Sequence, residues 1–200
     1  MCPGGVVVQS SSEEGGVVVN GMSAYRRDGE FSNSALVVAV RPEDLEGDDS
    51  LAGVRFQQHW ERTAFVAGGR SYRPPAENLL SFLGRGEGGI RSTCRPQVCE
   101  ADLAQTLPPF VGEGLRRALP QFERRMRGFV TAEATLIGIE SRTSAPLRIL
   151  RGDDGESISH PGLYPMGEGA GYAGGIMSAA LDGLKMAEKI VSQINDRSRC

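Results

Sequence analysis

A dense run of glycines near the C-terminal end is the part of this sequence whose residue types could do chemistry. It spans residues 162–176, reads GLYPMGEGAGYAGGI, and precedes an apolar, helix-forming segment. Glycines in such a turn let the backbone approach a ligand closely. A helix that follows directs free N–H groups and the positive end of its dipole at whatever lies there. This geometry is typical of a nucleotide or flavin site, and the residues expected to line it are Gly167, Glu168, Gly169, Ala170, Gly171, Ala173, Gly174, Gly175 and Ile176.

The segment after the turn has the periodicity of an amphipathic helix. Its apolar and small residues recur at steps of three and four, which is the helical pattern: Ile176, Ala179, Ala180, Gly183, Leu184, Ala187, Ile190, Val191 and Ile194. The small residues among them would let the helix lie close to a sheet or to another helix. The alternative is a plain C-terminal helix that caps a core. The density of glycines before the helix favours the ligand site.

Two further groups of polar residues are candidates for contact with a ligand or substrate. Glu168 follows an expected final strand over 162–168, and its carboxylate could accept hydrogen bonds from ligand hydroxyls or from its own turn. Arg142 lies among three hydroxyl residues, where an apolar strand expected over 134–140 ends. Its guanidinium could bind a substrate carboxylate with two hydrogen bonds, or form a structural ion pair. Arg142 and Ser144 are therefore the catalytic candidates.

Composition narrows the fold class and the kinds of partner. The 200 residues include 27 glycines and 11 prolines at 40% hydrophobic content, which favours a loop-rich α+β chain over a helix bundle. A net charge of −3 implies no general attraction to nucleic acid or to an anionic membrane. No apolar run is long enough to span a bilayer and no secretory leader is visible, so a cytoplasmic location is expected. The spacing of the four cysteines predicts neither zinc nor a disulfide framework, so no metal site is expected.

The elements that must position these residues follow from periodicity and turn residues. A basic arginine-rich segment near Pro120 is interpreted as a solvated or domain-facing helix, because it lacks the interleaved aromatic residues of a nucleic-acid surface. The expected elements are a hairpin over 6–8 and 17–19, a strand over 35–40, a helix over 54–67, a short apolar turn over 79–83, helices within 112–127 broken at Pro120, the strand over 134–140, an apolar run over 147–150, and the strand over 162–168.

The glycine-rich run resembles a known motif. Residues 162–176 are similar to the C-terminal flavin-closing motif of a family of uncharacterised FAD-dependent dehydrogenases, which belong to the flavoproteins with two dinucleotide-binding domains. The resemblance covers nearly the whole chain. Six further segments of this chain resemble the middle section of the family's proteins: CPGG at 2–5, SSEEGG at 11–16, NGMS at 20–23, RDGE at 27–30, NSAL at 33–36 and ESRTSAP at 140–146.

The first dinucleotide-binding motif of such proteins is not found in this sequence. That motif is a GxGxxG turn after a strand, with an acidic residue about twenty positions later. GRGEGG at 84–89 has no strand before it and no apolar helix after it, and it is interpreted as a flexible loop. The chain therefore resembles the C-terminal portion of a larger flavoprotein. The missing dinucleotide-binding half is an expected partner, in the same chain or in another.

The resemblance implies a domain organisation and a function. Residues 1–150 would form a mixed-sheet, substrate-type α+β domain, and 151–200 would supply the terminal strand–turn–helix of a split Rossmann-like FAD-binding domain. The complete protein would be an FAD-dependent oxidoreductase acting on an unidentified small molecule, with Glu168 holding a hydroxyl of the ribityl chain. This chain alone would be inactive. The alternative is a non-catalytic remnant or interaction module that keeps the fold without the cofactor.

Overall fold

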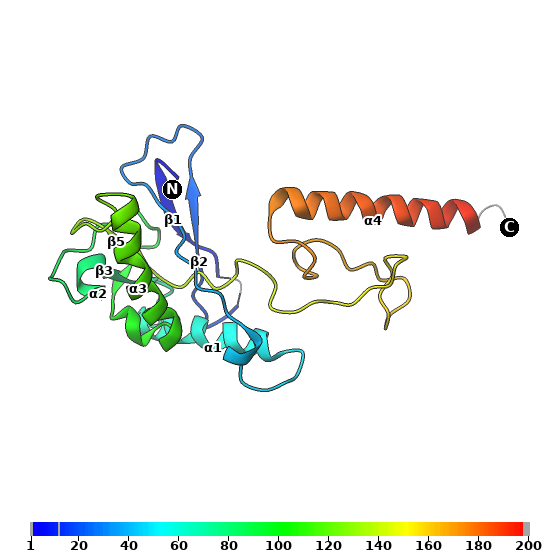
Figure 1. The fold of residues 1–200 in the computed structure, drawn as a ribbon, viewed down its shortest axis with the longest axis horizontal. Coiled ribbons are helices and arrows are strands. Elements are labelled where there is room, and N and C mark those ends of the chain that lie inside the picture. Colours follow the sequence, from blue (N-terminus) through cyan, green and yellow to red (C-terminus); the bar gives the residue numbers. More distant parts are fainter. Residues whose placement is uncertain (1, 12, 198–200) are drawn as a thin grey trace. The chain divides into compact units, whose positions relative to one another are not determined.

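The computed structural model describes residues 2–11 and 13–197, which divide into two compact units (Figure 1). Unit 1 comprises the described residues up to Glu46 together with Phe56–Ser141. Unit 2 comprises Gly47–Arg55 and the described residues from Arg142 onward. Helices occur together with small antiparallel and mixed sheets, so the predicted α+β class is confirmed.

Unit 1 contains two sheets. Strands β1 (Gly5–Gln9) and β2 (Val19–Ser23) pair antiparallel, with Val7 opposite Gly21. The predicted hairpin is thus confirmed, although its second strand begins where the prediction ended. In the second sheet, β3 (Pro75–Asn78) is central, parallel to β4 (Cys99–Glu100) and antiparallel to β5 (Thr135–Ile137). This second sheet is mixed, as expected, but β5 is shorter than the predicted strand over 134–140.

Three helices accompany these sheets. Helix α1 (Ala52–Ala67) matches the prediction closely, and α2 (Leu79–Phe82) is the short apolar turn expected after β3. Asn78 caps α2, because its side-chain oxygen accepts a hydrogen bond of 2.9 Å from the backbone N–H of Leu80. Helix α3 (Pro109–Arg125) completes the set, and short 3₁₀ turns lie at Pro42–Asp44 and Leu103–Gln105.

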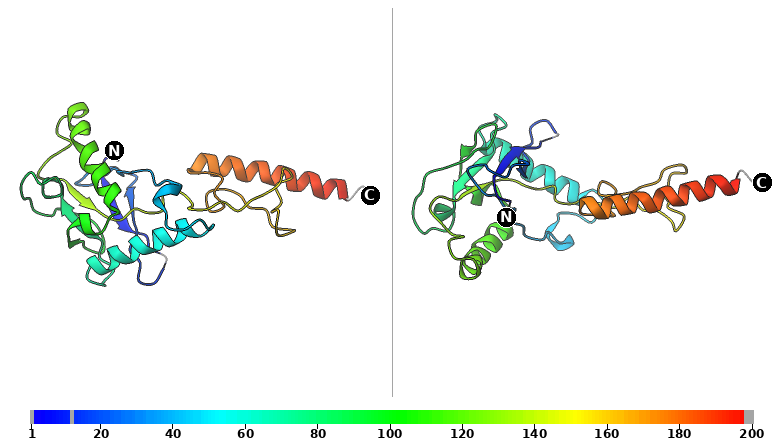
Figure 2. Two further views of the ribbon diagram at one scale, coloured as in Figure 1. Left: turned by 60° about the horizontal axis from the view of Figure 1, so that its bottom comes forward. Right: turned by 90° about the horizontal axis from the view of Figure 1, so that it is seen from above.

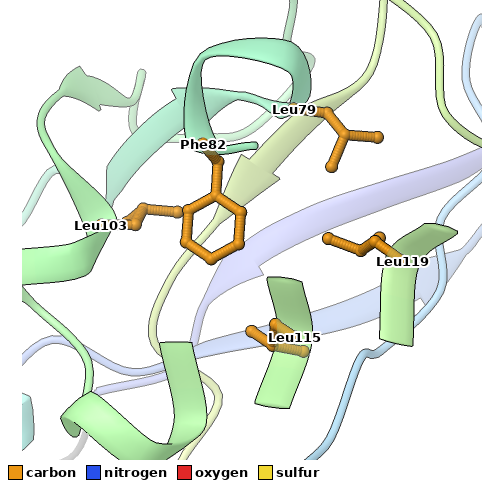
Figure 3. Packing of buried hydrophobic residues seen from close by; sticks show 5 residues of the cluster. All are labelled: Leu79, Phe82, Leu103, Leu115 and Leu119. Atoms are coloured by element: carbon orange, nitrogen blue, oxygen red, sulfur yellow. The ribbon is translucent and has the colours of Figure 1, made fainter. Parts of the chain in front are cut away.

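The main core of unit 1 lies between α2, α3 and the turn at Leu103–Gln105. Figure 3 shows five side chains converging from these elements. All are almost completely shielded from solvent, which is the main source of folding free energy in a unit of this size. The five are Leu79, Phe82, Leu103, Leu115 and Leu119. A second buried cluster joins Val17, Ala64 and Ile139.

Two predictions for unit 1 are wrong. No strand forms over 35–40, because this segment joins neither sheet, although its alternation persists: Leu36 and Val38 pack against the core, while Val37 is exposed. Pro120 does not break α3. Proline lacks the N–H that would bond to the carbonyl of the residue four positions earlier. Apolar residues on both sides of Pro120, including Leu119 and Phe122, pack on the same core and keep the helix continuous.

Glu77 on β3 predicts a measurable pH effect on unit 1. Its Oε2 accepts a hydrogen bond of 3.0 Å from the backbone N–H of Leu103, and burial, with a smaller contribution from Asp102, raises its pKa. A raised carboxyl pKa stabilises the fold at low pH, and this stabilisation is lost as the pH rises. Glu77→Gln keeps an acceptor for Leu103 and carries no charge. We expect it to raise the stability of unit 1 at neutral pH but not below the ordinary glutamate pKa.

Urea denaturation followed by the fluorescence of Trp60 at several pH values measures this effect. The exposed Glu87→Gln is the control and should leave the pH profile unchanged. Equal profiles for wild type and Glu77→Gln would contradict the prediction.

Unit 2 is built around a single long helix, α4 (Ile176–Arg197). The helix is unbroken in every view, and the segment over 147–175 runs alongside it without a helix or strand of its own (Figures 1 and 2). It begins at Ile176, as predicted. The strand expected over 162–168 does not form, and the apolar run over 147–150 is also irregular in the described part of this unit. Gly162 and Gly167 have φ of +81° and +71°, which strand pairing does not allow. The Rossmann-like part of the fold prediction is therefore not confirmed.

Candidate functional site

The glycine turn, defined here as residues 167–175, leads directly into α4. Two hydrogen bonds close it on itself: Gly171 N–H donates to the carbonyl of Glu168 at 2.9 Å, and Tyr172 N–H donates to the carbonyl of Gly167 at 3.0 Å. The first N–H groups of α4 have no acceptor within the helix. No acidic residue lies in the first turn of α4 to offset the positive end of its dipole. An electron-rich group would therefore be stabilised there.

An ion pair fixes the start of the glycine turn to α4. Arg151 binds Asp182 through two hydrogen bonds, Nη2 to Oδ1 at 2.6 Å and Nη1 to Oδ2 at 3.0 Å. Arg151 also donates to the carbonyl of Pro165 at 2.8 Å, and Asp182 Oδ2 accepts from the N–H of Gly167 at 2.8 Å. Both charged side chains are only 14% exposed. The pair with Arg151 lowers the pKa of Asp182 to about 2, so the carboxylate is charged at neutral pH.

Tyr172 fixes the second half of the turn. Its ring lies 3.6 Å from the guanidinium carbon of Arg151 and 5.0 Å from that of Arg148, both within cation–π range. Its hydroxyl accepts a hydrogen bond from the N–H of Arg151 and donates one to the carbonyl of Ile149, each at 3.1 Å. Arg148 Nε donates to the carbonyl of Gly171 at 3.0 Å. Side chains outside the turn therefore hold it at Gly167 and at Gly171.

The glycines of the turn differ in what requires them. Gly171 has φ of +82°, and a Cβ there would lie 2.3 Å from the carbonyl oxygen of Leu147. The fold of unit 2 therefore requires glycine at position 171. A Cβ at Gly169 or Gly174 would meet nothing within 4 Å, and neither residue has a positive φ. Packing within the described chain does not require glycine there. These two positions leave room for a close external contact.

The predicted cofactor-binding residues lie in the glycine turn and at Ile176, the first residue of α4. Gly174 and Ile176 are exposed beside the helix N-terminus, whereas Gly167 and Ala170 are buried against the rest of unit 2. Glu168 is exposed, but it lies within the turn and does not follow a strand, so that part of the prediction is wrong. Binding of a cofactor by these residues stays a prediction.

Arg142 and Ser144 are both exposed and lie in the irregular segment at the start of unit 2. The expected strand end at 140 is wrong, because β5 ends at Ile137. The chain therefore reaches Arg142 without regular structure. A role for either residue in substrate binding stays a prediction.

The ion pair between Arg151 and Asp182 is the part of this site that sequence reasoning missed. The two residues are 31 positions apart, and each lies in a stretch with other charged residues. Asp182 is on the polar side of the predicted helix, where a solvated carboxylate is the usual expectation. No local pattern distinguishes it from Glu188.

Within 2–11 and 13–197, no group of three or more His, Cys, Asp or Glu side chains is arranged to hold a metal ion. None of the helices in these ranges combines the length and apolar character needed to cross a bilayer. Burial raises the pKa of the Cys94 thiol, whereas Cys2 is exposed.

The chain is similar to a protein family and to a bacterial protein. Residues 1–143 match the model of a family described as "FAD-dependent protein, C-terminal domain-like". An "Uncharacterized protein" of Clostridium beijerinckii (strain ATCC 51743 / NCIMB 8052) is 45% identical over 199 residues. This match covers 98% of the chain but only 37% of the relative. The family model thus spans unit 1, whereas the similarity to the relative extends through the glycine turn and α4.

Proposed function

Because the chain belongs to the FAD-dependent protein, C-terminal domain-like family, we propose that it closes over FAD and holds a small-molecule substrate in a flavin-dependent oxidoreductase. The family description associates FAD with the full protein. The observation that carries the finer proposal is the glycine turn. It is hydrogen-bonded at Gly167 and Gly171 to side chains outside it, it leads into a long helix, and it contains two glycines that its own fold does not require.

The residues of the turn fit a flavin. The open positions at Gly169 and Gly174 would let the backbone approach a flat ring closely. The N–H groups of Gly174, Gly175 and Ile176 would face its pyrimidine edge, and Glu168, which is exposed, would accept a hydrogen bond from a ribityl hydroxyl. FAD, when bound, supplies a ring that accepts and returns electrons. The positive helix end would stabilise negative charge on that ring.

Substrate binding is assigned to the segment that opens unit 2. Arg142 is exposed, and its guanidinium would bind a carboxylate or carbonyl oxygen of the substrate, with the hydroxyl of Ser144 donating a further hydrogen bond. An anionic or carbonyl-bearing small molecule is therefore the proposed substrate class.

The proposal requires a second component. Contacts to adenosine and pyrophosphate are typically made by a GxGxxG turn between a strand and a helix. Residues 84–89 and 169–174 have this glycine spacing, but no strand leads into either segment. The chain spans about 37% of the length of its Clostridium relative. We therefore expect the chain alone to bind FAD weakly or not at all, and the other contacts to come from the remainder of a protein of that length.

A full-length chimera tests the proposed function. In it, this chain replaces the matching segment of the Clostridium beijerinckii relative. We expect the purified chimera to show the flavin absorbance band and calorimetry of the chain alone to show little FAD binding. Gly174→Leu should fill the open position and lower the flavin content of the chimera at least about tenfold, equivalent to about 1.4 kcal/mol or more.

Gly89→Leu is the matched control, because Gly89 is also exposed, has no positive φ and has nothing within 4 Å of an added Cβ. It lies in unit 1 and should leave the flavin content unchanged. A chimera without flavin would contradict the proposal and support the interaction-module alternative. Equal flavin content in Gly174→Leu and wild type would remove the glycine turn from the site.

A further inference from the structure

Helix α4 has two faces with different surroundings. Its inner face packs within unit 2: Asp182 binds Arg151, Met186 is only 2% exposed, and Gln193 accepts a hydrogen bond of 2.8 Å from the hydroxyl of Tyr164. Its opposite face is apolar and exposed. We define this outer face by six exposed residues spaced four, four, three, four and three positions apart: Ile176, Ala180, Leu184, Ala187, Val191 and Ile194.

The outer face is too apolar and too long to be an ordinary solvated surface. Its large side chains are between 56% and 89% exposed, and Met177 extends it along one edge. The helix has 22 residues, so the face is about 30 Å long at 1.5 Å per residue. Contiguous exposed apolar surface on this scale marks an interaction site. Because alanines alternate with the large residues, a flat apolar surface could approach the helix axis closely.

The length of the relative indicates what covers the outer face of α4. The match covers 37% of the Clostridium protein, so the remaining 63% is chain that has no counterpart here. Unit 2 supplies one long helix covered on one side by irregular chain, and stable domains cover such a helix with a second layer. In a protein of the relative's length, that layer can come from the same chain. Because a surface in the same chain has a high effective concentration, it would bind the outer face in preference to a second copy of the chain.

We propose that the outer face of α4 docks onto an apolar surface of the part of the longer protein that this chain does not cover. The interface is uncharged along its centre. Glu188 lies at its border and Ser192 lies outside it. The proposal goes beyond flavin binding, since the contact would form with or without the cofactor.

The test compares substitutions at two neighbouring positions, first in the chain alone and then in the full-length chimera. Val191→Asp places a charge on the outer face, and Ser192→Asp places the same charge one position along, outside it. In the chain alone, both residues are exposed, and neither variant should change the melting temperature appreciably. In the full-length chimera without added FAD, Val191→Asp should lower the melting temperature by several degrees, and Ser192→Asp should not.

Oxidation of Met177 by hydrogen peroxide, followed by mass spectrometry, gives a second measurement that needs no variant. Met177 is 71% exposed in this chain. Its oxidation should be at least about fivefold slower in the chimera. Equal oxidation rates together with equal effects of Val191→Asp and Ser192→Asp would overturn the proposal.

Light scattering on the chain alone tests whether a second copy of the chain covers the outer face. A stable dimer that Val191→Asp dissociates and Ser192→Asp leaves intact would assign the face to a second copy, and would overturn the proposal. A chimera that protects Met177 but lacks flavin would contradict the proposed function and leave the docking surface supported. The two proposals therefore fail separately.

Discussion

Gly171→Ala is expected to destabilise unit 2 by about 2–5 kcal/mol, the sum of left-handed backbone strain and overpacking. Gly171 has φ of +82°, and the added Cβ would lie 2.3 Å from the carbonyl oxygen of Leu147 and 3.0 Å from Cα of Arg148. Both contacts are backbone, so no side-chain rotation relieves them. The turn must open, and its hydrogen bonds with Glu168 and Arg148 should be lost.

Hydrogen exchange measured by mass spectrometry localises this effect. We expect faster exchange over 147–175 and α4, with unit 1 unchanged. Gly174→Ala is the control in the same turn, because its Cβ meets nothing within 4 Å and its φ is not positive. That variant should stay within about 0.5 kcal/mol of wild type. Equal effects of the two substitutions would show that the turn is not built as described.

Asp182→Asn is expected to cost unit 2 about 2–4 kcal/mol, somewhat less than a fully buried ion pair, because each partner is 14% exposed. The amide has one acceptor, whereas the carboxylate accepts from both Arg151 and Gly167. An NH₂ group in place of Oδ2 would face the N–H of Gly167 and a guanidinium N–H. Arg151 would keep its charge in a mostly enclosed position, and the glycine turn would detach from α4.

The same pair predicts a pH dependence with a definite sign. The pKa of Asp182 is lowered from its ordinary 3.8 to about 2, chiefly by the hydrogen bonds with Arg151. A lowered carboxyl pKa gives stability that is fully present above the ordinary pKa and is lost as the pH falls toward 2. Wild-type unit 2 should therefore weaken between about pH 4 and pH 2. The difference between wild type and Asp182→Asn should shrink over the same interval.

Asp49 provides the control for this experiment. It pairs with Arg55, and its pKa is also lowered to about 2, but both side chains are more than half exposed. Water screens such a pair, so Asp49→Asn should barely change the stability. Hydrogen exchange of 147–175 at neutral and acidic pH measures both variants. A pH profile unchanged by Asp182→Asn would refute the clamping role of the carboxylate.

The elements that the sequence determined by itself are those whose signal is local. Helices α1 and α4 begin within two residues of their predicted starts, because apolar residues at three- and four-residue steps define one side of a helix whatever it packs against. The β-branched runs at 6–8 and 17–19 likewise predicted the β1–β2 pair from local composition. The position of the glycine turn also followed from local composition. Membership of the FAD-dependent family, first indicated by short motifs, is shown by the family match.

Tertiary structure decided the features that depend on partners far along the chain. Residues 35–40 alternate like a strand, but no neighbouring strand offers hydrogen bonds to them. Pro120 stays within α3 because the core holds apolar residues on both sides of it. Arg151 and Asp182 meet across 31 positions, and only the folded path of unit 2 brings them within 2.6 Å. The type of a single residue does not predict which distant residue it will contact. These contacts therefore follow from the packing of whole elements.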